Sequence, residues 1–143
     1  MKNIIIMTLF MTGVFLYATE NTFSISGEIE FRKKGTIYIA LVSEEYERTE
    51  NPVPEYSLVI DEDVLDMKAK NISFRFTDIP EGVYGIRIFQ DLNNNAKLDS
   101  GAFGPKEPWG MSNNIRPAFR GPTFDEIKFD VFSNISGMNI ILK

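Results

Sequence analysis

A strict alternation of apolar and polar residues restricts the fold of this chain more than any other feature. In the stretch FSISGEIEF, residues 23–31, every odd-numbered position is Phe, Ile or Gly, and every even-numbered position is Ser or Glu. Successive side chains of a β-strand point to opposite faces, so this pattern is typical of a strand with one buried face. The first element that the sequence predicts is therefore a half-buried β-strand.

The rest of the chain predicts further short strands separated by turns. Residues 36–42, TIYIALV, are apolar at both sets of alternate positions, which indicates a central strand, and Gly35 is expected to take the positive φ of a turn. Residues 43–55 are polar with two prolines and are expected to form a loop, as are residues 61–70 and 90–122. The remaining predicted strands are residues 56–60, 71–76, 84–88, 126–132 and 137–143.

Short strands with turn signals between them, and no convincing helix, predict an all-β fold. The expected architecture is an antiparallel Greek-key β-sandwich of about seven strands. Its core is expected to come from apolar residues at alternate strand positions: Phe23, Ile25, Ile29, Ile37, Ile39, Phe74, Phe76, Tyr84, Ile86, Ile88, Ile127, Phe129 and Ile140.

The N-terminal residues have the features of a secretory signal peptide. Lys2 precedes an apolar run over residues 4–17, which is shorter than the roughly 20 residues needed to span a bilayer, and Ala18 is a small residue suited to cleavage. We expect residues 1–18 to be a signal peptide and residues 19–143 to be a single domain, periplasmic or secreted and without stable membrane insertion. An uncleaved membrane anchor is the alternative.

Composition argues against several classes of function. The net charge is −5 and no basic cluster is present, which makes nucleic acid a poor partner. There is no His and no Cys, so the usual general base, the thiol nucleophile and disulfide cross-links are all missing. We therefore expect no enzyme, although a hydrolase that uses only carboxylates stays open.

The stretch DLNNNAKLD, residues 91–99, carries oxygen-bearing side chains at alternating positions. Calcium takes six to eight oxygen ligands, and loops supply them in this way. A calcium site would use the side chains and the one backbone carbonyl of the following residues: Asp91, Asn93, Asn95, Asp99 and Lys97 (carbonyl). Two carboxylates predict weak binding of Ca²⁺. The alternative is a polar turn, because Asp and Asn stabilise such turns without metal.

A second candidate site follows in SGAFGPKEPWGMSNN, residues 100–114. Trp109 is the only Trp of the chain and could form a platform for a sugar or peptide ring, with Asn113 and Asn114 beside it. The alternative is that Trp109 fixes the loop to the sandwich. An exposed Trp109 would favour ligand binding, and a buried one a structural role.

Three motifs resemble one group of bacterial proteins. They are a Pro-Gly-x-Tyr-like turn at residues 80–84 with one extra residue, an Asp-x-Asn-x-Asn loop at residues 91–99, and an aromatic-Gly-x-Ser-Asn-Asn segment at residues 109–114. Together they are similar to the exported, uncharacterised family called domain of unknown function 2141. The resemblance implies an exported sandwich of the transthyretin-like (prealbumin-like) or carboxypeptidase-regulatory-like kind, and implies no activity.

The chain departs from this family pattern at three positions. Gln90 stands where His is frequent, Ala96 where Gly is frequent, and Met111 where Phe is frequent. The first removes any histidine-dependent role, and the second makes the loop stiffer, which weakens the calcium hypothesis. The leading hypothesis is a binding module for an unknown glycan, peptide or protein, and the alternative is a structural or interaction domain.

Overall fold

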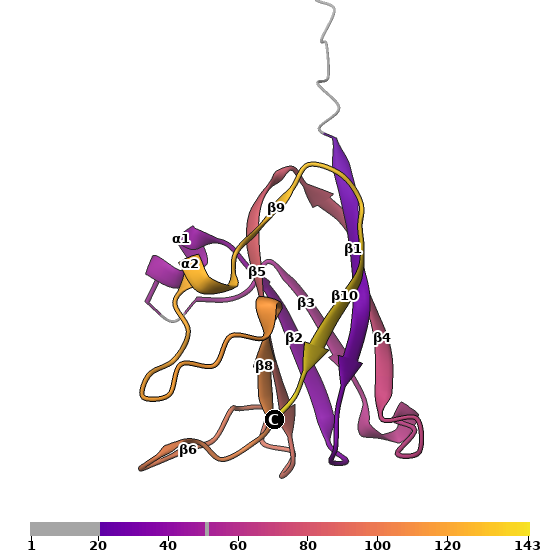
Figure 1. The fold of residues 1–143 in the computed structure, drawn as a ribbon, viewed down its shortest axis with the longest axis vertical. Helices are drawn as coiled ribbons and strands as arrows, with labels where there is room; N and C mark the ends of the chain where they lie inside the picture. Colours follow the sequence, from indigo (N-terminus) through magenta and orange to yellow (C-terminus); the bar gives the residue numbers. More distant parts are fainter. Residues whose placement is uncertain (1–20, 51) are drawn as a thin grey trace, which may run out of the picture.

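The alternating segments form strands in the computed structural model, which describes residues 21–50 and 52–143 (Figure 1). The main strands are β1 (Thr22–Glu30), β2 (Thr36–Val42), β3 (Tyr56–Ile60), β4 (Asn71–Pro80), β5 (Gly82–Asp91), β8 (Trp109–Met111), β9 (Phe129–Val131) and β10 (Ile135–Ile141). A small hairpin consists of β6 (Ser100–Gly101) and β7 (Gly104–Pro105). The helical turns are α1 (Glu44–Arg48), η1 (Glu62–Val64), η2 (Ser112–Asn114) and α2 (Phe124–Ile127). The predicted signal peptide lies outside the described residues.

The strands form the two layers of a sandwich. One sheet has the order β10-β1-β4, and the other has the order β3-β2-β5-β8, with β9 also pairing with β5. The predicted central strand, β2, lies between β3 and β5. The all-β sandwich is thus confirmed, while its Greek-key, transthyretin-like connectivity stays a prediction.

The pairing of β1 with β10 differs from the predicted antiparallel arrangement. These two strands run parallel, whereas the other six strand pairs in the described part of the chain are antiparallel. Gly27 lies at this contact, where a Cβ atom would be only 2.2 Å from the carbonyl oxygen of Met138. Only glycine allows the two backbones to approach so closely.

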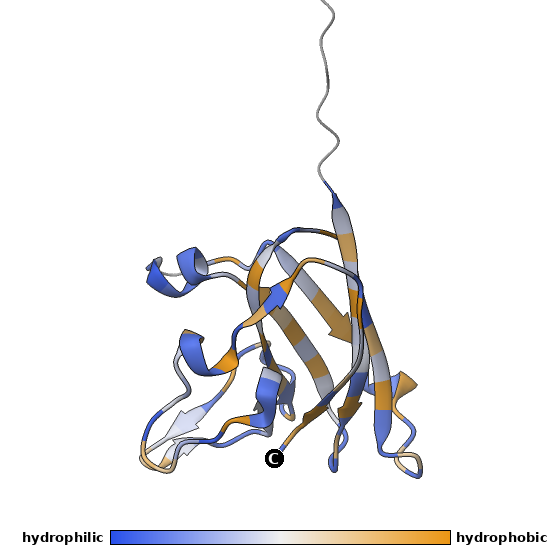
Figure 2. Ribbon diagram, turned by 45° about the horizontal axis from the view of Figure 1, so that its top comes forward, coloured by the Kyte–Doolittle hydropathy of each residue, from blue (hydrophilic) through white to orange (hydrophobic). Residues whose placement is uncertain are grey.

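All thirteen predicted core residues are buried or pack against the buried cluster. Figure 2 shows the same alternation as hydrophobic bands separated by polar ones along the strands. The structure adds several apolar residues that alternation did not single out, all of them 8% exposed or less: Leu41, Val42, Leu65, Ile79 and Leu142.

Two predicted segments have a different secondary structure. Residues 126–132 were expected to form one strand, but the segment begins as α2 and becomes a strand only at Phe129. Glu126 stabilises the start of α2, because its carboxylate accepts a hydrogen bond of 2.9 Å from the backbone N–H of Thr123. The loop over residues 43–55 contains α1, whose N-cap Ser43 accepts a bond of 3.3 Å from the N–H of Tyr46.

Gly35 is required for a reason other than the expected turn. Its φ is not positive, and instead a Cβ atom there would lie 2.4 Å from the carbonyl oxygen of Asp91. The long predicted loop after Asp91 carries the β6–β7 hairpin and β8. No helix within residues 21–50 and 52–143 has the length and apolarity to cross a membrane.

Candidate functional site

Asp91, at the end of β5, organises the polar loop over residues 91–99. Its side chain is 1% exposed, and its carboxylate accepts three backbone hydrogen bonds, from Asn93 at 3.1 Å, Asn95 at 3.3 Å and Ala96 at 2.7 Å. Burial disfavours the charged carboxylate, but these N–H donors outweigh burial and lower the pKa of Asp91 below its ordinary value. Asp91 therefore acts as the anchor around which the loop turns.

Asp99 closes the loop from its other end. Its carboxylate accepts hydrogen bonds from the side-chain amide of Asn93 at 2.7 Å and from that of Asn95 at 3.1 Å. Lys97 contributes its backbone N–H, which donates to Oδ1 of Asn95 at 2.9 Å. The structure thus brings three of the predicted ligand side chains to one point, while the Lys97 carbonyl stays a predicted ligand.

Glu107 is a member of this loop that the sequence pattern did not reveal. It is 6% exposed, and its two carboxylate oxygens accept from the backbone N–H groups of Leu92, at 2.8 Å, and Asp99, at 3.0 Å. One carboxylate therefore holds both ends of the loop together. Glu107 lies eight residues beyond Asp99, so no local spacing rule would have connected them.

Left-handed backbone conformations complete the loop. Asn94 has φ 60° and Ala96 has φ 58°. Asn tolerates this region, but an alanine Cβ is crowded there, at a cost of about 1–2 kcal/mol. Glycine would adopt this conformation without that cost.

The polar side chains of the loop already bond one another and the loop backbone. Carboxylate and amide oxygens are also the ligand type that calcium takes. Among residues 21–50 and 52–143, no group of three His, Cys, Asp or Glu side chains is arranged to hold a metal ion. Asn93 and Asn95 turn their side-chain nitrogens toward Asp99, while their Oδ1 atoms accept from the N–H groups of Asn95 and Lys97. These bonds form a polar turn, and calcium, which takes oxygen ligands, would require both amides to rotate.

Trp109, on β8, is half-buried and lines a cleft. The guanidinium carbon of Arg116 lies 4.0 Å from the centre of the indole ring, and Arg116 also donates a hydrogen bond to the carbonyl of Trp109. Burial lowers the pKa of Arg116 from its ordinary value, yet a guanidinium stays charged. Arg116 therefore braces Trp109 by a cation–π contact, and part of the ring remains open to the cleft.

The cleft has a volume of about 840 Å³ and lies between two loop arms. One arm is the β6–β7 hairpin with its tip at Phe103, the other is the segment over residues 117–122 with Phe119, and β8 contributes Trp109 and Met111. Phe103 and Phe119 have relative exposures of 105% and 102%. We call this the aromatic cleft, defined by Phe103, Trp109, Met111 and Phe119.

The two arginines of the aromatic cleft are already paired. Arg87 forms a two-pronged ion pair with Glu47 at 2.6 and 2.8 Å, and its third nitrogen donates to the sulfur of Met111 at 3.7 Å. Arg120 forms a similar pair with Glu126 at 2.7 and 2.8 Å. Apart from these two arginines, the lining side chains are aliphatic, aromatic, proline or glycine.

Asn113 and Asn114 hold the end of β8 rather than line the cleft. Asn113 donates from its side chain to the carbonyl of Glu126 at 3.1 Å, and Asn114 bonds both the carbonyl of Asn139 at 2.8 Å and the N–H of Ile141 at 2.9 Å. Both have positive φ, 67° and 54°. Ligand contact by these two residues stays a prediction, while their backbone contacts secure the base of the cleft.

Sequence reasoning found Trp109 but missed the two phenylalanines. Phe103 occurs in GAFG and Phe119 in PAFRGP, so each is an aromatic residue between small residues or prolines in a segment without apolar periodicity. That context is a usable signal of an exposed ring, because such a segment has no face to bury.

Comparison with known proteins gives one match. No curated protein and no solved structure matches the chain. A family model described as "Uncharacterized protein conserved in bacteria (DUF2141)" matches residues 29–137, which include the polar loop, the aromatic cleft, β4 and the β3-β2-β5-β8 sheet. The chain therefore belongs to the DUF2141 family of uncharacterised bacterial proteins.

Proposed function

We propose that this protein is an exported, non-enzymatic binding module that takes an apolar polypeptide segment in the aromatic cleft. The observation that carries the proposal is the pair of fully exposed rings, Phe103 and Phe119, on two arms that flank Trp109. Large exposed apolar groups gathered around a concave surface are typical of interaction sites. Export rests on the N-terminal signal-like residues, and the absence of His and Cys supports a role without catalysis.

The lining chemistry favours a polypeptide over a glycan. Sugar hydroxyls require carboxylate, amide or hydroxyl partners, and the lining side chains of the cleft include none of these. Its two arginines already bond Glu47 and Glu126, so the cleft offers little unpaired charge to an anion. Pro-rich and aromatic segments, in contrast, bind to aromatic-lined grooves with little loss of conformational entropy.

Fluorescence of Trp109 provides a direct test, since it is the only Trp. Mature protein is titrated with a capped ten-residue peptide of Pro, Leu and Phe, and in parallel with maltoheptaose. We expect the peptide alone to change the emission. The double variant Phe103→Ser/Phe119→Ser should bind it about 10- to 100-fold more weakly, because fully covering one phenyl ring contributes about 1.5–3 kcal/mol.

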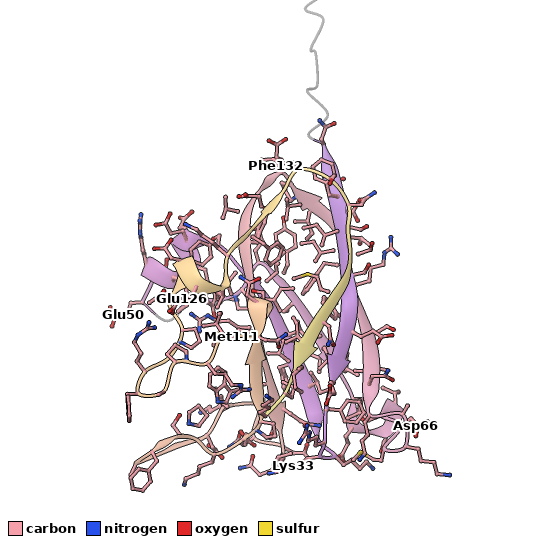
Figure 3. The ribbon with its side chains drawn as sticks, viewed as in Figure 1. Lys33, Glu50, Asp66, Met111, Glu126 and Phe132 are labelled. Carbon is pink, nitrogen blue, oxygen red and sulfur yellow. The ribbon has the colours of Figure 1, made fainter. Side chains whose placement is uncertain are left out.

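The matched control is Phe132→Ser. Phe132 is 61% exposed and lies at the end of the sandwich opposite to Lys33, whereas the β6–β7 hairpin lies at the same end as Lys33 (Figures 1 and 3). This variant should bind the peptide like the wild type. Binding of maltoheptaose but not the peptide would assign the cleft to a glycan, and binding of neither would favour a structural role.

We also propose that the polar loop binds one calcium ion weakly. The supporting observation is the convergence of Asn93 and Asn95 on the carboxylate of Asp99 within 3.1 Å. A bound ion would supply the positive charge that the amide N–H groups now provide to Asp99. With so few carboxylates, the dissociation constant should be on the order of 10⁻⁴–10⁻³ M, as in extracellular calcium modules.

Melting curves in chelator and in millimolar calcium test this second proposal. At ten times the dissociation constant, calcium should add about 1.4 kcal/mol and raise the melting temperature by several degrees. Asp99→Asn should abolish the shift, whereas Asp130→Asn, at an exposed position on β9, should retain it. Equal melting temperatures of the wild type in both solutions would identify the loop as a polar turn.

A further inference from the structure

A separate hollow of about 280 Å³ lies between α1, the segment over residues 52–55 and the ends of three strands. Its walls include three tyrosines and two glutamates, and we call it the tyrosine pocket, defined by Tyr46, Tyr56, Tyr84, Glu45 and Glu55. These residues come from α1, β3, β5 and the loop before β3. The pocket shares no lining residue with the aromatic cleft.

Strand pairing places the tyrosines at the end of the core. Leu41, near the end of β2, pairs in register with Tyr56 on one side and with Ile86 on the other, and Tyr84 precedes Ile86 by two positions on the same face. Leu41 is 2% exposed, and Tyr56 and Tyr84 pack against the buried cluster. A tyrosine in such a place keeps its ring on apolar neighbours and its polar end near water.

The two glutamates of the tyrosine pocket form no ion pair with a Lys or Arg of the described residues. Glu45 and Glu55 are exposed, no Lys or Arg lines the pocket, and neither glutamate forms an ion pair within the described residues. The nearby cations are already used, because Arg48 pairs with Glu44 and Arg87 pairs with Glu47. An added cation would therefore meet two carboxylates that no other group neutralises.

Tyr84, at the inner edge of the pocket, is uncharged. The hydroxyl of Tyr84 donates a hydrogen bond of 3.2 Å to the carbonyl of Pro80. Burial, and then the negative charge of Glu55, raise the pKa of Tyr84 above its ordinary value, so this phenol keeps its proton in the physiological range. Tyr84 is consequently a neutral phenol beside the carboxylate of Glu55.

We propose that the tyrosine pocket binds an alkylammonium cation, of the kind carried by a lysine side chain or by a free amine. Tyrosine rings attract cations through the negative face of the π-system, and the attraction strengthens where several rings surround one charge. The carboxylates of Glu45 and Glu55 add a Coulomb attraction that the net charge of −5 reinforces. The volume lies below the roughly 300–1,000 Å³ typical of drug-sized ligands, which suits one side chain or a small amine.

Paired probes that differ in charge test this inference. Binding of Nα-acetyl-lysine amide, Nα-acetyl-norleucine amide and n-butylammonium is followed by amide chemical shifts of the mature protein. We expect the two cations to bind with dissociation constants on the order of 1 mM, and to shift residues around Tyr46 and Tyr84, while norleucine amide does not bind. Tighter binding of lysine amide than of butylammonium would identify a polypeptide as the source, and the reverse would identify a free amine.

Variants separate ring, charge and surface effects. Glu55→Gln should weaken binding of lysine amide about 2- to 5-fold, as for an exposed ion pair, and Glu28→Gln, at an exposed position on β1, should not. Tyr46→Leu should weaken it about 3- to 30-fold, whereas Tyr46→Phe, which keeps the ring, should stay within about 3-fold of the wild type.

Three results would overturn the inference: equal binding of norleucine amide and lysine amide, wild-type affinity in Glu55→Gln, or equal losses in Glu55→Gln and Glu28→Gln. Binding here is independent of the aromatic cleft. The Phe103→Ser/Phe119→Ser variant should therefore bind lysine amide normally, so failure of either proposal leaves the other standing.

Discussion

Glu107 and Glu126 each use one carboxylate to hold a loop that strand pairing does not support. Glu107 joins both ends of the polar loop through the N–H groups of Leu92 and Asp99. Glu126 bonds Arg120 and also accepts from Thr123, and so fixes the arm that carries Phe119 to the start of α2. At the scale of single residues, the proposed binding surface depends on these two acids.

The pKa of Glu126 gives a prediction at this scale. The hydrogen bond from Arg120, followed by that from the Thr123 backbone, lowers it from 4.5 to about 2. Because the folded pKa is depressed, the stabilisation is complete above the ordinary pKa of 4.5 and is lost as the pH falls toward 2. Carboxyl ¹³C titration of Glu126 should show a midpoint near pH 2 in the wild type.

Two arginine variants check the cause of this depression. Arg120→Met should move the midpoint of Glu126 upward toward its ordinary value, because the largest contribution is removed. Arg75→Met should leave it unchanged, since the side chain of Arg75, on β4, bonds Ser24 on the neighbouring strand β1 and not Glu126. A wild-type midpoint near 4.5 would show that the ion pair does not persist in solution.

At the scale of the elements, the parallel pairing of β1 with β10 depends on the contact between Gly27 and Met138. At Gly27 the two backbones leave no room for a Cβ atom, and beside it β10 carries one extra residue, because Ile25 pairs with Ile135 but Gly27 pairs with Met138. The residues that follow β10 in turn connect to β8, because the N–H and carbonyl of Lys143 both bond Trp109. The close approach at Gly27 therefore supports the base of the aromatic cleft as well as the first sheet.

Replacing this glycine is a test at the scale of the element. A Cβ at position 27 would lie 2.2 Å from the Met138 carbonyl oxygen, so Gly27→Ala must displace backbone and should destabilise the fold by about 1–3 kcal/mol in urea unfolding. Gly121→Ala is the control, because a Cβ there has no atom within 4 Å, and its effect should stay within about 0.5 kcal/mol. A near-neutral Gly27→Ala would contradict the close pairing of β1 with β10.

At the scale of the whole molecule, one side of the sandwich carries the irregular elements. α1, α2 and the β6–β7 hairpin all project from the side of the second sheet in Figures 1 and 2. α1 contributes Glu47 to an ion pair beside the aromatic cleft, and Tyr46 and Glu45 to the tyrosine pocket. The short helix α1 thus contributes residues to the surroundings of both proposed sites.

The sequence by itself determined the all-β class, the central place of β2 and the thirteen core residues. The alternation of apolar and polar residues is a local property of the chain, and it reflects the burial of one face of each strand. Local spacing was therefore sufficient to predict the strands and their buried residues. The hydrogen bonding of the polar loop also followed in part, because Asp and Asn act on residues two to five positions away.

The parallel pairing of β1 with β10, the role of Glu107 and the aromatic cleft were decided only by the tertiary structure. Each joins segments whose separation in the chain carries no periodic signal. Prediction from local spacing also failed for α2. Ile127 is buried, as alternation predicted, but the bonds between Glu126 and Thr123 make its segment a helix and not a strand. Burial can be predicted from neighbouring residues, but the partners that a residue meets depend on how the whole chain closes.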